Sequence, residues 1–402
     1  MKLNKTPLSI ALAIASTCST AVMAQDDLTN ALVNGKASVN LNLRYENVDQ
    51  DNALKPAKAL TLRTRLTYAT GTVNGFSSLI EFEDSRNVLG VDDYKNTLGK
   101  NNEYSVIADP ETTEVDQMLV QYKQESFTAK LGRQVLTMDN HRFVGHVGWR
   151  QDRQTFDGVT FDYKASESLT LKYGYITQRN RIFAEGKDIE SKDHLINASY
   201  KAKAGTLTGY SYLLEVDNNT DNSLDTYGLR FSGASQLDKQ KVTYSFEYAV
   251  QDADTASTSY SSNYLLAEIG TTVSGLGLKV GYELLGSDDG MYGFSTPLAT
   301  LHKFNGWSDQ FLATPKEGLT DLYASVGGKA AGGKWAVIYH TFNADESSAT
   351  VDDLGTELNA VYTKIFSKNY TAGIKFSAYS AGDEGTGKVD TDKLWVWVNA
   401  KF

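Results

Sequence analysis

The chain has 402 residues, of which 41% are hydrophobic and 22% charged, and it contains 23 tyrosines, 16 phenylalanines and one cysteine. Its aromatic content is too high for a disordered chain, and its slightly negative mean hydropathy excludes a bundle of membrane-spanning helices. The formal net charge of −10 argues against nucleic-acid binding, which needs a basic surface.

The first 24 residues have the pattern of a secretory signal peptide. Lys2 and Lys5 form a positive start, residues 8–15 an apolar core, and residues 22–24 a small-residue cleavage site. The mature chain is therefore predicted to start at Gln25 after Sec export, without the single cysteine and with a net charge of −12 once the two lysines are removed.

From residue 37 onward, apolar and polar residues alternate with a period of two, as in 60–68, where leucines alternate with arginines and threonines. Such alternation places apolar side chains on one face of a strand and polar ones on the other. Eighteen segments carry this pattern. They are 37–48, 59–70, 76–83, 113–123, 126–136, 153–164, 168–179, 192–201, 205–216, 224–234, 240–250, 261–272, 275–285, 319–328, 333–342, 354–365, 369–379 and 391–402.

The connections between these segments differ in length. Those after even-numbered segments are short, whereas those after odd-numbered ones are mostly longer, the longest being 84–112 and 286–318. Short turns on one rim and long loops on the other are typical of outer-membrane barrels, whose apolar faces meet lipid. We predict an all-β fold, a transmembrane antiparallel up-and-down barrel of about eighteen strands in one domain, 25–402. A soluble sandwich or propeller is the alternative.

The last segment supports a membrane barrel. It alternates up to Phe402, and a terminal aromatic residue on such a strand resembles the signal that barrels present to their insertion machinery. With an even strand count, 37–48 should pair with 391–402 and both termini should lie at the periplasmic rim.

Arginines are confined to one part of the sequence. All eleven lie between residues 44 and 230, and some have inward parity or cluster around 137–152. Guanidinium groups bind carboxylates bidentately, so a track of them in the lumen predicts an anionic solute. The predicted lumen residues are Arg44, Arg63, Arg65, Arg133, Arg150, Arg153 and Arg230. The alternative is that they pair with inward acids, which include Glu46, Glu81, Glu83, Asp162, Glu247, Glu268, Glu283 and Glu357.

The long connection 286–318 is too apolar for a freely solvated loop. We predict that it folds inward and narrows the pore, because a barrel has no other core for these residues. A cap outside the mouth and a contact with lipopolysaccharide are the alternatives. The predicted constriction residues are Phe294, His302, Lys303, Phe304 and Trp307.

No cofactor or metal site is predicted. Acid pairs in the outer loops, such as Asp92-Asp93, can bind divalent cations weakly, but a solvated acidic rim is the simpler interpretation. His141 and His146 lie in one loop near acidic residues, without a third and fourth ligand at a recognisable spacing. No serine motif surrounds His340, and no enzymatic activity is predicted.

Several motifs resemble those of the alginate-export family of outer-membrane proteins. They are Gly132-Arg133-Gln134, Gly148-Trp149-Arg150, Thr155-Phe156-Asp157-Gly158, the block 296–307, Asp321-Leu322-Tyr323 and Gly355-Thr356-Glu357-Leu358. The resemblance implies an eighteen-stranded monomeric barrel that passes an anionic uronate polymer, with Arg133, Arg150 and Arg153 in matching motif positions. The exporter's long periplasmic turn has no counterpart here, which favours a passive channel at least as much as export.

The sequence thus predicts a bacterial outer-membrane channel for passive diffusion or export of anionic, alginate-like saccharides. The alternatives are a general unselective porin and a structural or adhesive barrel. Its expected partners are membrane lipid, lipopolysaccharide, the insertion machinery and an acidic saccharide, with no nucleic acid and no second subunit.

Overall fold

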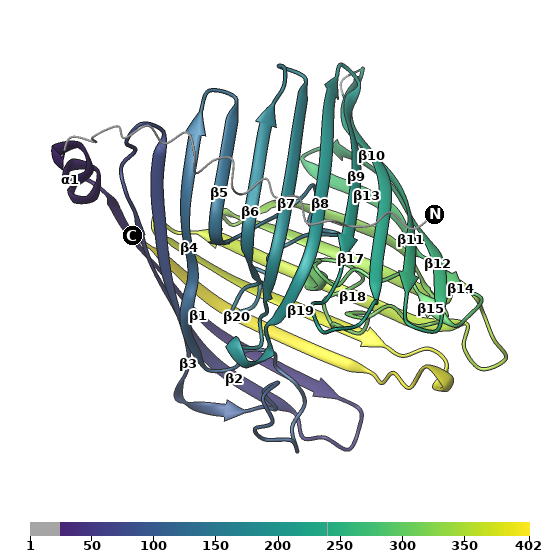
Figure 1. The fold of residues 1–402 in the computed structure, drawn as a ribbon. Helices are drawn as coiled ribbons and strands as arrows, with labels where there is room; N and C mark the ends of the chain where they lie inside the picture. The colour runs from purple at the N-terminus through teal and green to yellow at the C-terminus, as the bar shows by residue number, and fades with distance from the viewer. Residues whose placement is uncertain (1–24, 239) are drawn as a thin grey trace.

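The computed structural model describes residues 25–238 and 240–402, so the predicted signal peptide lies outside the described residues. Eighteen antiparallel strands form one closed sheet (Figure 1). The barrel closes where β1 (Lys36–Gln50) pairs with β20 (Thr391–Lys401), as predicted. None of the described helices is long and apolar enough to cross a membrane.

The remaining barrel strands follow in chain order around the sheet. They are β2 (Ala57–Ala69), β3 (Phe76–Asp93), β4 (Thr112–Gln124), β5 (Phe127–Gln134), β6 (Thr155–Lys164), β7 (Leu169–Asn180), β8 (Ile189–Ala202), β9 (Gly205–Leu214), β10 (Ser223–Leu237), β11 (Gln240–Asp254), β12 (Ser259–Val273), β13 (Leu276–Leu285), β16 (Leu319–Ala330), β17 (Gly333–Asn343), β18 (Asp353–Ile365) and β19 (Tyr370–Ser380).

Short elements complete the described chain. They are the helix α1 (Gln25–Val33), the hairpin of β14 (Ser287–Asp288) and β15 (Tyr292–Gly293), and the 3-10 turns η1 (Glu185–Lys187), η2 (Leu301–Lys303) and η3 (Glu384–Thr386).

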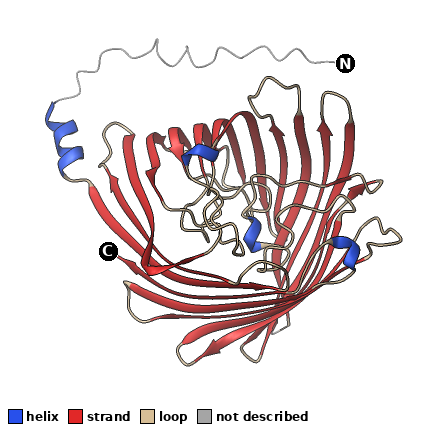
Figure 2. Ribbon diagram, turned by 90° about the horizontal axis from the view of Figure 1, so that it is seen from below, coloured by secondary structure: helices blue, strands red, loops and turns tan. Residues whose placement is uncertain are grey.

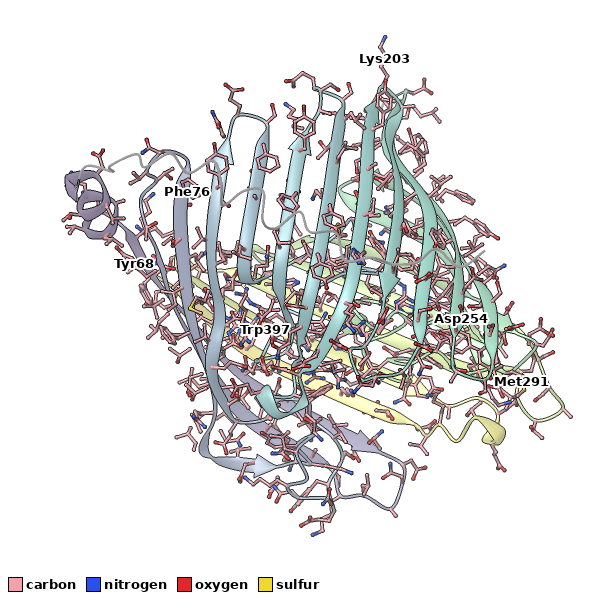
Figure 3. All side chains as sticks on the ribbon, in the orientation of Figure 1. Tyr68, Phe76, Lys203, Asp254, Met291 and Trp397 are labelled. Carbon is pink, nitrogen blue, oxygen red and sulfur yellow. The ribbon has the colours of Figure 1, made fainter. Side chains whose placement is uncertain are left out.

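The two faces of the barrel wall have opposite polarity. Leu66, Phe82 and Phe246 on the outside are each about half exposed, whereas the inward Arg63 and Glu247 are buried. The predicted alternation therefore places apolar side chains toward lipid and polar ones toward the lumen. The aromatic residues Tyr68 and Phe76 lie near the rim of short turns (Figure 3), at the height where interfacial girdles occur.

The two rims differ as expected. At one rim the described connections are tight, and the longest of them runs from residue 70 to 75. At the other rim the connections 94–111, 135–154 and 286–318 are long. Figure 3 places Lys203 at the tip of the first rim and Met291 at the opposite end.

One predicted strand was too short. The segment 76–83 continues as β3 to Asp93, which reduces the expected loop 84–112 to 94–111. The reason is irregular pairing: the register of β3 shifts against β2 near Leu60 and against β4 between Glu81 and Phe82. Such irregularities interrupt the simple alternation on which the prediction was based.

Two long connections enter the lumen instead of leaving the barrel. Figure 2 shows loop segments filling much of the interior of the ring of strands. The ring centres of Phe143 (segment 135–154) and Phe294 (segment 286–318) lie 5.9 Å apart, and both rings contact Tyr264 on the inner wall. The lumen thus contains an apolar core that anchors both segments.

Candidate functional site: the lumen and its inward segments

Cations gather on four adjacent strands of the inner wall, β19, β20, β1 and β2. We call this set the basic sector. Its inward, buried cations are Arg44, Arg63, Arg65, Lys375 and Lys393. They share the wall with Trp395 and Trp397, and Trp397 stands directly opposite Arg44 in the strand register. Sequence reasoning found the three arginines by parity but missed both lysines.

Carboxylates gather on the strands from β11 to β18, which we call the acidic sector. Its inward members are Glu247, Glu268, Glu283, Asp321 and Glu357. Charges of opposite sign thus face the lumen from two neighbouring sectors of the wall.

Most of the predicted arginines pair with carboxylates, as the alternative interpretation of the sequence required. Arg44 pairs with Asp109, Arg65 with Glu83, and Arg230 with Glu247. Such pairs neutralise much of the guanidinium track. Arg63 is different: it donates to Asn40 Oδ1 at 2.7 Å, and no carboxylate oxygen of the described residues lies within ion-pair distance of it.

The two loop arginines lie inside the lumen, as predicted. Arg150 contacts Glu46 at 2.9 Å and Asp309 at 3.1 Å, which joins the wall to both inward segments. Arg153 contacts Asp116 at 2.6 Å.

Arg133 does not lie in the lumen, and the prediction for this residue is wrong. In the register of β4 and β5 it stands opposite Met118, and its neighbour on the same face is Leu131. Both residues are on the outward face, with exposed fractions of 57% and 65%. There the guanidinium pairs with Asp157 at 2.8 Å, so it contributes to the outer surface rather than to the pore wall.

The segment 286–318 lies across the lumen, and its predicted constriction residues occupy different positions there. Phe294 is fully buried against Phe143, and Phe304 lies under the Arg142 guanidinium at 4.8 Å. Lys303 donates to the carbonyl oxygen of Asn140 at 2.8 Å and, like Trp307, lines a cavity of about 390 Å³ beside the acidic sector. Cavities of this size hold small organic ligands.

Asp309 is the centre of a buried charge cluster that sequence reasoning missed. It accepts from Lys393 at 2.7 Å, from Arg150 at 3.1 Å and from His302 Nδ1 at 2.6 Å. Burial would raise the pKa of Asp309, but these three neighbours hold it well below the ordinary value. Burial and the nearby Lys375 ammonium lower the pKa of His302 to about 3, so that its ring is neutral at pH 7.

Tryptophans surround Lys375 in the same region. The ammonium lies 4.1 Å from the Trp149 ring, 4.0 Å from that of Trp307 and 5.0 Å from that of Trp395. It also contacts His302 Nε2 at 2.6 Å, and it has no carboxylate within ion-pair distance among the described residues. The Lys375 amino group therefore contacts aromatic faces and an imidazole rather than a carboxylate.

The stability of the barrel should depend on Asp309. A carboxyl with a depressed folded-state pKa contributes stability above its unfolded pKa of about 3.9, and this contribution is lost as pH falls through the folded pKa. We expect Asp309→Asn to lower the free energy of unfolding at pH 7 by about 3–5 kcal/mol, because the buried Lys393 loses its carboxylate partner while Arg150 keeps only Glu46 and Asp109. Urea unfolding of the refolded barrel measures this. The exposed Asp289→Asn is the control, and equal stability of the two variants would contradict the prediction.

Comparisons with known proteins agree with this geometry. The sequence profile of the family described as alginate export matches residues 36–287, more than half of the chain. The chain belongs to the alginate export family. No curated protein sequence matches it at a significant level.

Solved porins have the same fold as this member of the alginate export family. OccAB4 of Acinetobacter baumannii is 15% identical with a TM-score of 0.70, over 92% of this chain and 98% of that one. OccK3 (OpdO) of Pseudomonas aeruginosa is 13% identical with a TM-score of 0.67, over 93% and 97%. The outer membrane protein opdK of Pseudomonas aeruginosa is 12% identical with a TM-score of 0.69, over 92% and 99%.

The family and the fold together identify an outer-membrane channel for solutes rather than an enzyme. The barrel wall provides the membrane-spanning surface, and the inward segments with the charged sectors determine what the lumen offers to a solute.

Proposed function

We propose that the chain is a passive channel for small acidic saccharides of the uronate type. The observation that carries the proposal is the basic sector with its tryptophans. Arg63 and Lys375 are cations without a carboxylate partner among the described residues. Trp149 and Trp307 contact the Lys375 ammonium, and both rings, like that of Trp397 on the same wall, are partly exposed. Indole faces suit sugar rings, and the cations suit a carboxylate on the same ring.

The short turns of the described rim favour passive diffusion over export that is coupled to a periplasmic assembly. A channel that exports a polymer needs a surface toward the assembly that delivers it, and connections of six residues or fewer offer little surface for one. We further propose that residues 1–24 direct Sec export, that the barrel is a monomer, and that Phe402 at the end of the last strand contributes to its insertion.

A general porin is the second candidate, and the pairing of most lumen arginines with carboxylates favours it. Liposome swelling separates the two. An acidic-saccharide channel should admit glucuronate and its dimer faster than glucose and cellobiose of matching size. Equal rates for neutral and acidic sugars would leave the general porin as the function.

Titration of single channels with a uronate oligomer provides a second test. Solutes that bind in the lumen interrupt the current, so brief blockades should appear with the oligomer and their frequency should rise with its concentration. A neutral oligomer of equal length is the control. Absence of blockades over the whole concentration range would contradict a saccharide site at the tryptophans.

A further inference from the structure

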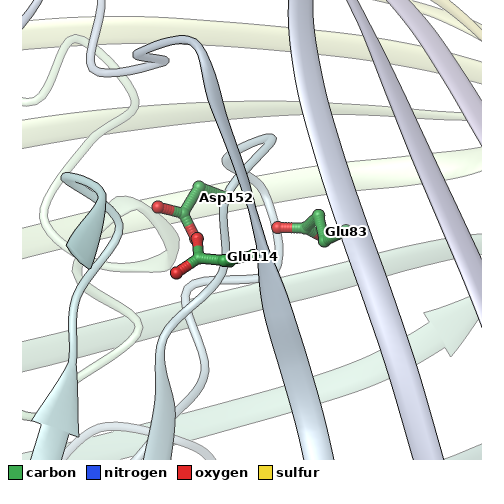
Figure 4. A group of neighbouring side chains, drawn as sticks. All are labelled: Glu83, Glu114 and Asp152. Carbon is green, nitrogen blue, oxygen red and sulfur yellow. The ribbon is translucent and has the colours of Figure 1, made fainter.

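Three carboxylates from three segments meet on the inner wall beside the basic sector (Figure 4). Glu83 on β3 stands opposite Glu114 on β4, and Asp152 comes from the inward segment 135–154. One oxygen of each lies within 4.8 Å of the other two. Like charges in directly opposite positions of two strands destabilise a sheet, so this carboxylate cluster requires a compensating charge.

Neighbouring cations do not supply enough charge. Arg65 pairs with Glu83, and Arg153 pairs with Glu81 and Asp116. These two guanidinium groups pair with three of the five carboxylates in this region. The other two, Glu114 and Asp152, have no ion-pair partner among the described residues.

Glu83 provides an independent sign of a ligand. Its side chain is 0% exposed, and its Oε1 atom has no hydrogen-bond partner among the described residues. Figure 4 shows its carboxylate directed toward Glu114 and Asp152. Glu114 Oε1 is likewise buried without a partner. A buried carboxylate oxygen without a donor is costly in free energy, and a bound cation removes that cost.

We propose that Glu83, Glu114 and Asp152 bind a calcium ion. Calcium takes oxygen ligands at about 2.3–2.6 Å and accepts irregular geometry, so three oxygens within 4.8 Å of one another fit around one ion. The donor set contains only carboxylates, which disfavours transition metals that prefer imidazole or thiolate. The site does not rest on the proposed transport of saccharides.

The ion connects the wall to the inward segment. Asp152 lies between Arg150 and Arg153, so a calcium ion shared with β3 and β4 fixes the part of the segment that carries both lumen arginines. Asp152 also accepts from the backbone N–H of Ala184 at 3.2 Å, which holds its carboxylate in place. Calcium would thereby hold the segment 135–154, with Arg150 and Arg153, against the barrel wall.

Equilibrium dialysis of the purified, folded full chain against radioactive calcium tests the site. We expect wild type to bind one ion, Glu114→Gln with Asp152→Asn to bind it at least about tenfold more weakly, and the exposed control Glu103→Gln to bind it unchanged. No binding by wild type at millimolar calcium, or equal binding by the double variant, overturns the proposal. Equal affinity for magnesium overturns the assignment to calcium.

Crystals of the unmodified chain soaked in calcium chloride provide a readout that does not depend on any variant folding. Anomalous density between the three carboxylates supports the site. Density confined to the acidic outer loops, or no density at all, overturns it and leaves the cluster held together by shared protons.

Discussion

Replacing residues 290–312 by a short glycine–serine linker should increase single-channel conductance severalfold. This stretch crosses the lumen and contacts the wall on several sides. Asn305 donates to Glu283 at 2.7 Å, Ser308 bonds to Ser377 at 2.7 Å, and Asp309 pairs with Lys393. Conductance rises with the free cross-section of a pore, so removal of a segment that occupies the interior has a large effect.

The measurement is planar-bilayer conductance of a variant shown to be folded by its heat-modifiable migration. Removal of the exposed residues 218–221 from another outer connection is the matched control, since these residues lie outside the lumen core. A folded variant without 290–312 that conducts like wild type would show that the segment does not limit the pore. Phe294 is fully buried and anchors the segment in the lumen. Shorter deletions that keep Phe294 should therefore raise the conductance by less than the full replacement does.

The barrel could be predicted because its signals are local. Alternation within single strands places Arg44, Arg63 and Arg65 inward, and the structure agrees. The apolar content of 286–318 likewise predicts an inward path, since a barrel has no other place to bury such residues. These inferences need only the residues of one segment and the physics of a lipid-facing wall.

The charge cluster could not be predicted in this way. Asp309 contacts Arg150 and Lys393, which are 159 and 84 residues away in the sequence, and no local sequence pattern predicts contacts over such separations. Arg133 is a different case. Its parity with the apolar Leu131 indicates the outward face, whereas its place in a family motif indicates the lumen, and the structure agrees with the parity.

The paired arginines also change what the lumen charge is expected to do. A guanidinium within 3 Å of a carboxylate contributes little net field to a solute, because the two charges form a compact dipole. Selectivity should therefore depend on the cations of the basic sector that lack such a partner, Arg63 and Lys375. Any outer-loop acid farther from the lumen than the Debye length of about 8 Å is largely screened from the pore.

Arg63→Gln together with Lys375→Gln should move the reversal potential in a salt gradient toward cation selectivity, from an anion preference in wild type. Arg133→Gln provides a matched control, because it removes a guanidinium of the same chain from the outward face. Its reversal potential should equal that of wild type. A cation-selective wild type, or a double variant with an unmoved reversal potential, would contradict the anionic preference. The carboxylates that pair with the other arginines would then determine the selectivity, as expected for a general porin.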